Sequence, residues 1–341
     1  MKSFKNIFYI LATIGLIIVL LYYGKFLLIP LSFGALIAIL LDPLMEKLSN
    51  WISYHSIKYG LALTVFASGF FIPVYLIITS ITGIFSKEDW SKNLDATIKG
   101  VEEEITTHPM IINLAPDQAN DLLNKFLGYL QDFIGFFVID SMTALSNIIF
   151  SLLFSYFLHA YYVKSKSTIL KALEKEPRKT LKKITMLVPS AIQSYVLGLL
   201  LVMLVMTVLT SILFLIIGLD YALLWGAIVG FFVIIPYIGS IIGIAFPLMY
   251  SIIQTGNIDQ ALYILLGYAV IQFLEGNFIT PRIIGDKVGI NPFLIILVML
   301  FMGTLWGIPG VIISIPLLTV VKTILEANEL DSVVKIFFNS K

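Results

Sequence analysis

Residues 276–292 read GNFITPRIIGDKVGINP, and they interrupt a chain that is otherwise apolar enough to lie in a membrane. Amide, hydroxyl, charged, glycine and proline residues stand here where apolar residues would be expected to continue. In a bilayer each unpaired backbone group is costly, so irregular polar sequence persists only where it is buried in protein or lines a water-filled cavity. The stretch therefore predicts part of a solute pathway.

The composition of the rest of the chain predicts an all-α integral membrane protein. Of the 341 residues 59% are hydrophobic and 13% are charged, whereas roughly a quarter of the residues in soluble domains are charged. The net charge of +1 gives no electrostatic signature for nucleic acid. The chain has no cysteine, and His55, His108 and His159 are far apart in sequence. No nucleophile or phosphate-loop motif is present, so we expect neither an enzyme nor a bound cofactor or metal.

Eight apolar runs predict the membrane segments. The first follows Lys2 and Lys5 and is longer than a usual signal-peptide core. Because no small-residue cleavage pattern follows it, we expect it to remain as a helix. The second run is expected to end at Asp42-Pro43, since the residue before a proline disfavours helical geometry. The runs cover about 7–23, 26–41, 61–85, 133–163, 188–219, 222–253, 259–273 and 292–321.

Two charged segments orient the chain. Residues 86–132 carry four lysines against nine carboxylates, and residues 164–183 carry eight basic residues against two glutamates. The positive-inside rule makes the basic segment cytoplasmic and the acidic one a small extracytoplasmic helical cap, with the N-terminus inside. A lipid-headgroup or nucleotide site is the alternative for the basic segment, although clustered lysines beside a helix usually serve topology and attraction to anionic lipid. The expected organisation is three helices in 1–85, the cap in 86–132, a fourth helix in 133–163, a basic loop in 164–187, a transport region in 188–325 and a cytoplasmic tail in 326–341.

Two of the apolar runs are interrupted at their centres. A continuous helix over 222–253 would be about 48 Å long at 1.5 Å per residue, against a hydrocarbon core of about 30 Å. Proline and glycine predict the breaks, as they do within 303–310, which reads GTLWGIPG. Paired interrupted segments indicate the site of a secondary transporter, and we expect them to move during transport; two kinked ordinary spans are the alternative. The predicted breaks or hinges are Pro236, Gly239, Gly307, Pro309 and Gly310.

Polar side chains concentrate around the end of the 259–273 segment. Gln272 and Glu275 are three residues apart, so on a helix they share a face, and an ionisable residue at membrane depth is a functional candidate. Alternatively, Glu275 pairs with Arg282 or Lys287 as a structural clamp. The predicted substrate or ion pathway contains Gln272, Glu275, Asn277, Thr280, Pro281, Arg282 and Tyr237.

Four stretches of this sequence resemble the autoinducer-2 exporter (AI-2E) family of bacterial membrane proteins. They read FLLIPLSFGALIAILLDPLMEKL at 26–48, FVIIPYIGSIIG at 232–243, QFLEGNFITPRIIGDKVGINP at 272–292 and GTLWGIPGVIISIPLLTVVK at 303–322. The resemblance covers nearly the whole chain apart from 86–132. Where the family often has an Asn-Asn pair after the glutamate, this chain has Gly276-Asn277, so one potential amide ligand is missing.

The resemblance implies about eight membrane segments in the bacterial cytoplasmic membrane, with both termini in the cytoplasm and broken or re-entrant helices in the C-terminal half. The resemblance further implies a homo-oligomer, with a pentamer as the expected form. It also implies export of a small polar signalling molecule in some members and sodium or lithium/proton antiport in others. Three functions stay open: a small-solute exporter, a cation/proton antiporter, and a non-transporting protein with a developmental or assembly role. We expect secondary transport of a small polar solute, with a proton as the possible coupled partner and membrane lipid as surroundings.

Overall fold

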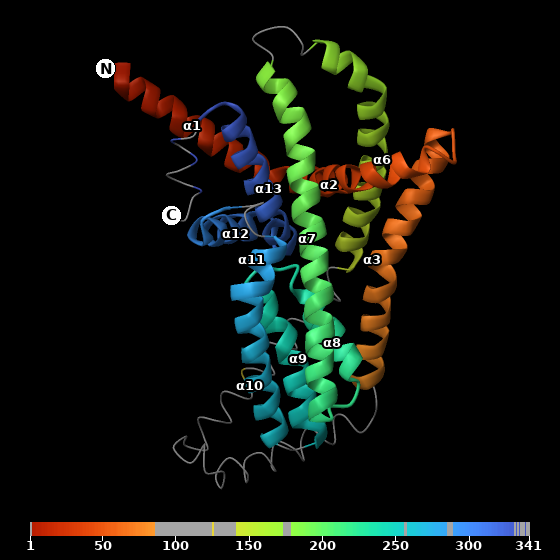
Figure 1. The fold of residues 1–341 in the computed structure, drawn as a ribbon. Helices are drawn as coiled ribbons and strands as arrows, with labels where there is room; N and C mark the ends of the chain where they lie inside the picture. The colour runs from red at the N-terminus through yellow and green to blue at the C-terminus, as the bar shows by residue number, and fades with distance from the viewer. Residues whose placement is uncertain are drawn as a thin grey trace. The chain divides into compact units, whose positions relative to one another are not determined.

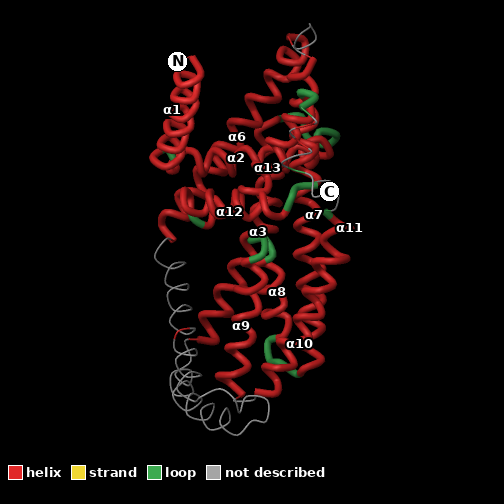
Figure 2. The backbone as a smooth tube through the Cα atoms, turned by 90° about the vertical axis from the view of Figure 1, so that its left-hand side faces the viewer, coloured by secondary structure: helices red, strands yellow, loops and turns green. Residues whose placement is uncertain are grey.

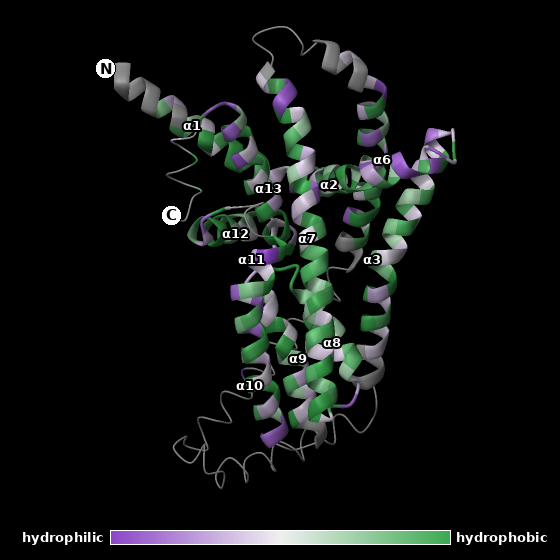
Figure 3. Cartoon of the chain, in the orientation of Figure 1, coloured by the Kyte–Doolittle hydropathy of each residue, from purple (hydrophilic) through white to green (hydrophobic). Residues whose placement is uncertain are grey.

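The computed structural model describes residues 2–85, 125, 141–172, 179–255, 258–284, 289–330, 332, 334 and 338. Across these residues the regular secondary structure is helical throughout, and six helices are long and apolar enough to cross a membrane (Figures 1 and 3). The all-α membrane fold predicted from the sequence is confirmed. The acidic cap predicted at 86–132 lies outside the described residues, except for Lys125.

The helices are, in chain order, α1 (Lys2–Tyr23), α2 (Lys25–Leu48), α3 (His55–Phe85), α6 (Ser141–Ala172), α7 (Lys179–Ile217), α8 (Ala222–Phe232), α9 (Ile238–Thr255), α10 (Ile258–Leu274), a π-helix η1 (Glu275–Ile279), α11 (Thr280–Ile283), α12 (Pro292–Trp306) and α13 (Ile308–Ala327). Much of the basic segment 164–187 is helical, because α6 continues to Ala172 and α7 begins at Lys179. The chain forms two compact units, of residues 1–66, 143–197 and 284–341, and of 67–142 and 198–283.

The first unit contains a helical hairpin made of α12 and α13. Gly307 breaks the helix between them with φ 67° and ψ −145°, a backbone conformation that only glycine adopts easily. Pro309 and Gly310 lie in the first turn of α13. The Lys322 ammonium donates to the Gly289 carbonyl at 3.1 Å, so α13 returns toward the start of α12. The 292–321 run is therefore a hairpin and not one kinked helix.

Helix α2 does not end at Asp42-Pro43 as the sequence predicted, but continues to Leu48. A proline inside a helix leaves the carbonyl four residues earlier without its usual donor. That carbonyl belongs to Ile39, and the side-chain amide of Gln193 on α7 donates to it at 2.7 Å. Beyond the proline, packing holds the helix, since Met45 is buried against Tyr59 of α3. Tertiary contacts here override the local preference.

We expect Gln193→Leu to lower the free energy of unfolding by about 1–3 kcal/mol, because it leaves the part-buried Ile39 carbonyl without a donor. In a Pro43→Ala background the new backbone N–H at position 43 can pair with the Ile39 carbonyl, so the same change should cost less than about half as much. Thermal unfolding of the four purified proteins completes this double-mutant cycle. Equal costs in both backgrounds would contradict the assigned role of Gln193.

The second unit contains a hairpin made of α8 and α9, with α10 beside it (Figure 2). At the start of α8, the ring centres of Tyr221 and Trp225 lie 5.9 and 5.1 Å from the ring centre of Tyr250. Tyr250 is near the end of α9, so the two helices run antiparallel. Residues 233–237 form the turn and include Pro236, while Gly239 lies in the first turn of α9. The 222–253 run is thus also a hairpin.

Three glycines let the helices of this unit touch through their backbones. A Cβ atom on Gly226 would lie 2.7 Å from the Ser211 nitrogen of α7, and one on Gly230 would lie 2.7 Å from the Met203 carbonyl oxygen. On α9, a Cβ on Gly243 would lie 3.0 Å from the Cα of Val229. Small residues four apart permit this close approach in membranes. Helix α8 is therefore held backbone to backbone between α7 and α9.

Candidate functional site

The site forms where α10 continues into the π-helix η1 and α11, all in the second unit. In a π-helix the hydrogen bonds join residues five apart, and the Thr280 N–H donates to the Glu275 carbonyl. The sequence predicted irregular structure from Gly276 onward, but residues 276–283 are helical. The helix satisfies its own backbone groups by widening for one turn, which removes the need for a break.

The Glu275 carboxylate accepts one hydrogen bond on each oxygen. The Gln272 side-chain amide donates to Oε2 at 2.9 Å, and the Thr280 hydroxyl makes a short hydrogen bond to Oε1. In an α-helix Thr280 would lie about 140° around the axis from Glu275, so the π turn is what brings the two together. Sequence spacing indicated the pairing of Gln272 with Glu275, but not that of Thr280.

Beside this carboxylate is a buried acceptor that lacks a donor. The Oε1 atom of Gln272 has no hydrogen-bond partner in the described part of the chain, and such an atom ordinarily costs about 1–3 kcal/mol. Glu275 and Gln272 thus gather carboxylate and amide oxygens in one place. This arrangement suits a ligand that brings hydrogen-bond donors or a positive charge.

Two tyrosines lie close to the cluster. Glu275 acts electrostatically on the hydroxyl groups of both Tyr237 and Tyr268, and Tyr268 donates to the Ser240 carbonyl of α9 at 3.0 Å. Tyr237 sits in the α8–α9 turn with a left-handed φ of 62°, an unusual conformation for a bulky residue. Sequence reasoning missed Tyr268, although it precedes Gln272 by four residues and so shares its helix face.

Other predicted pathway residues point elsewhere. Asn277 is exposed and donates to the Phe273 carbonyl at 2.8 Å, while Arg282 is exposed with its guanidinium 5.9 Å from the Phe278 ring centre. Pro281 is exposed on α11. Within the described residues Glu275 pairs with neutral donors and not with Arg282, and Lys287 lies outside them. Gly307, Pro309 and Gly310 belong to the other compact unit.

The cluster combines one carboxylate with amide and hydroxyl groups. No group of three or more histidine, aspartate and glutamate side chains able to hold a metal ion occurs among the residues the structure describes. The helix containing Glu275 has the length and hydropathy of a membrane span, from Asp259 to Ile283. A carboxylate placed inside such a span is a functional candidate.

Helices of membrane-spanning length, two helical hairpins and a carboxylate within a span are features of multi-pass membrane transport proteins. Residues 7–329 match the model of the AI-2E family of transporters. The chain belongs to this family, which confirms the resemblance noted in the sequence.

Curated relatives match the chain over shorter stretches. The chain is 38% identical over 110 residues to a putative transport protein of Borreliella burgdorferi, a stretch covering 32% of this chain and 30% of the relative. It is 35% identical over 138 residues to the putative transport protein YrrI of Bacillus subtilis, covering 40% and 38%. It is 34% identical over 106 residues to the AI-2 transport protein TqsA of Escherichia coli, covering 31% and 30%. The aligned part is thus about a third of each relative.

Proposed function

We propose that this membrane transporter is a secondary transporter that exports a small, polar, uncharged metabolite or signalling molecule across the bacterial cytoplasmic membrane. The observation that carries the proposal is the unpaired Gln272 Oε1 atom next to the Glu275 carboxylate. Both groups accept hydrogen bonds, so a solute rich in hydroxyl groups supplies the missing donors. Thr280 and Gln272 hold the carboxylate in place through their own hydrogen bonds.

Family membership and charge distribution support the rest of this proposal. A relative is named as an AI-2 transport protein, which favours a small polar signalling molecule as the solute class. The eight basic residues of 164–183 favour a cytoplasmic position for that segment and for both termini. The pentamer implied by the family resemblance stays a prediction.

Sodium or lithium/proton antiport is the second candidate, favoured by the oxygen atoms of the cluster. The Glu275 carboxylate, the Gln272 Oε1 atom and the Thr280 hydroxyl offer oxygen ligands of the kind that hard cations take. A carboxylate is also able to exchange a cation for a proton. A developmental or assembly role would need no solute flux, so two transport assays together separate the three functions.

Proteoliposomes containing the purified protein test the proposal. One set receives sodium or lithium outside and reports internal pH through a trapped dye; a second set is loaded with unlabelled ribose and measures exchange for radiolabelled ribose as the polyol probe. We expect protein-dependent ribose exchange without a cation-induced pH change. A cation-dependent pH change alone would establish antiport, and silence in both assays with folded protein would contradict transport by this cluster.

A further inference from the structure

Three titratable side chains from three helices form a continuous chain of hydrogen bonds in the first unit. The Nε2 atom of His159 on α6 lies 3.3 Å from Oδ1 of Asp42 on α2, and its Nδ1 atom lies 3.2 Å from Nε2 of His55 on α3. The His159 side chain is 3% exposed and that of Asp42 is 43% exposed. A buried imidazole thus bridges two more accessible groups.

One arrangement of protons satisfies all three groups when both imidazoles are neutral. His55 donates from Nε2 to Nδ1 of His159, and His159 donates from Nε2 to the Asp42 carboxylate. A neutral imidazole has one donor and one acceptor nitrogen, so both nitrogens of His159 are used. Because they point to different partners, the three groups cannot surround one metal ion, but their geometry suits proton transfer along a line.

Among the described residues, aromatic rings surround the two imidazoles, and Lys58 lies near His55. The His55 ring stacks on that of His159, with centres 5.3 Å apart, and the Tyr59 ring centre is 5.1 Å from that of His159. The ring centre of Tyr156 lies 6.4 Å from that of His55. The positive charge of Lys58 acts on the His55 ring. Adding a second proton to the pair would direct two N–H groups at each other, so the pair holds one extra proton before it holds two.

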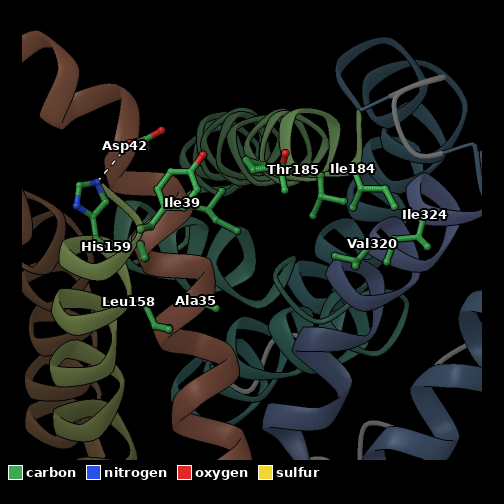
Figure 4. A pocket seen from close by; sticks show the side chains of 13 residues that line it. Ala35, Ile39, Asp42, Leu158, His159, Ile184, Thr185, Val320 and Ile324 are labelled. Atoms are coloured by element: carbon green, nitrogen blue, oxygen red, sulfur yellow. Dashed lines mark hydrogen bonds and ion pairs between the residues drawn. The ribbon is translucent and has the colours of Figure 1, made fainter. Parts of the chain in front are cut away.

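The two ends of this hydrogen-bonded series, Asp42 and His55, lie in different parts of the first unit. Asp42 and His159 form one wall of a pocket of about 420 Å³ whose other walls are mainly apolar, and Tyr162 lies in it as well (Figure 4). The volume is enough for several water molecules, each of which takes about 30 Å³ in the liquid. At the other end, half-buried His55 is the first residue of α3, directly after the segment that joins α2 to α3. The hydrogen bonds therefore join the pocket to that segment.

We propose that His55, His159 and Asp42 form a proton relay between the α2–α3 connection and the pocket. A proton binds Nδ1 of His55, the proton on Nε2 of His55 passes to Nδ1 of His159, and the proton on Nε2 of His159 passes to Asp42. Each transfer breaks one N–H bond and forms one N–H or O–H bond, so the relay carries one proton without other reactants. Rotation of the two rings restores the starting tautomers. Use of this proton to drive transport rests on the proposed function, whereas the relay itself does not.

Imidazole nitrogen NMR of protein labelled with ¹⁵N-histidine tests the relay directly. The chain has three histidines, so His108→Gln removes the third signal and His55→Gln assigns the remaining two. We expect both relay rings to carry their proton on Nε2 at high pH and to take up one shared proton, with coupled titration curves, as the pH falls. In Asp42→Asn the neutral amide oxygen replaces the charged carboxylate as the acceptor for Nε2 of His159, and the shared titration should shift for both rings.

Glu46→Gln, which removes an exposed carboxylate one turn along α2, is the matched control and should leave both curves unchanged. If Asp42→Asn does not fold, His55→Gln provides the same test. His55 is only half-buried, and its replacement should move the titration of His159. Independent titration of the two rings, unaffected by either substitution, would overturn the relay. The spectra require no transport, so silent proteoliposomes with coupled titrations would count against the proposed function alone.

Discussion

Transport is expected to fall by about 10- to 150-fold when Glu275 is replaced by glutamine. Hydrogen bonds to a charged group contribute about 1.5–3 kcal/mol, which corresponds to this range of rate or affinity. The fold should survive, because the Thr280 hydroxyl can rotate and the Gln272 amide can turn its unpaired Oε1 atom toward the new amide. The substitution thus removes the charge while both polar atoms of the side chain at position 275 keep a hydrogen-bond partner. Ribose exchange and cation-dependent pH change in proteoliposomes measure the effect for either candidate function.

Glu326→Gln serves as the matched control for that substitution. Glu326 on α13 is 47% exposed and lies 3.7 Å from the ammonium of Lys322, four residues earlier on the same helix. Surface pairs at this helical spacing contribute about 1 kcal/mol or less. Its loss should leave both assays within twofold of the unaltered protein. Full activity of Glu275→Gln, in protein that unfolds at the usual temperature, would remove Glu275 from the transport site.

The second large effect is expected on stability, from Gly226→Leu or Gly230→Leu. Overpacking ordinarily costs about 1–3 kcal/mol, and here the obstructing atoms include the Ser211 nitrogen and the Met203 carbonyl oxygen, which belong to the backbone. A helix backbone cannot turn aside as a side chain does, so we expect about 3 kcal/mol or more for each substitution. Thermal unfolding and size-exclusion behaviour in detergent measure the loss.

Gly69→Leu on α3 gives the comparison for these glycines. A Cβ atom at Gly69 would meet nothing within 4 Å, and leucine has a better helix propensity than glycine by roughly 0.5–1 kcal/mol. This variant should be as stable as the unaltered protein or slightly more so. If all three leucine variants unfold alike, the close contact of α8 with α7 does not determine stability.

The apolar runs predicted the helices, because run length and composition relate directly to the thickness of a bilayer. Proline and glycine likewise marked the places where α8 gives way to α9 and α12 to α13. The sequence did not predict that α2 passes through Pro43, since the compensating donor, Gln193, is 150 residues away along the chain. A local rule about proline cannot include a partner from a distant helix.

The candidate site was partly predictable for a similar reason. Gln272 and Glu275 are three residues apart, and on a helix this spacing puts them on one face. Their pairing was therefore predictable from residue numbers alone. Thr280 reaches the same carboxylate only because the helix widens for one π turn. No single residue from Glu275 to Ile279 predicts that widening. His159 meets His55 and Asp42 across 104 and 117 residues, so only the folded chain brings those groups together.

The glycine contacts of α8 also determine which helix of the second unit is free to slide. Helix α8 meets both α7 and α9 backbone to backbone, so shearing α8 past either neighbour would force main-chain atoms into collision. Helix α10 meets its neighbours differently, through the Leu213 side chain beside Gly267 and the Tyr268 hydroxyl on Ser240. Side chains change rotamer where backbones cannot yield. Among the helices α7 to α10, α10 is therefore the one whose contacts with its neighbours run through side chains, and a displacement of α10 would carry Glu275 with it.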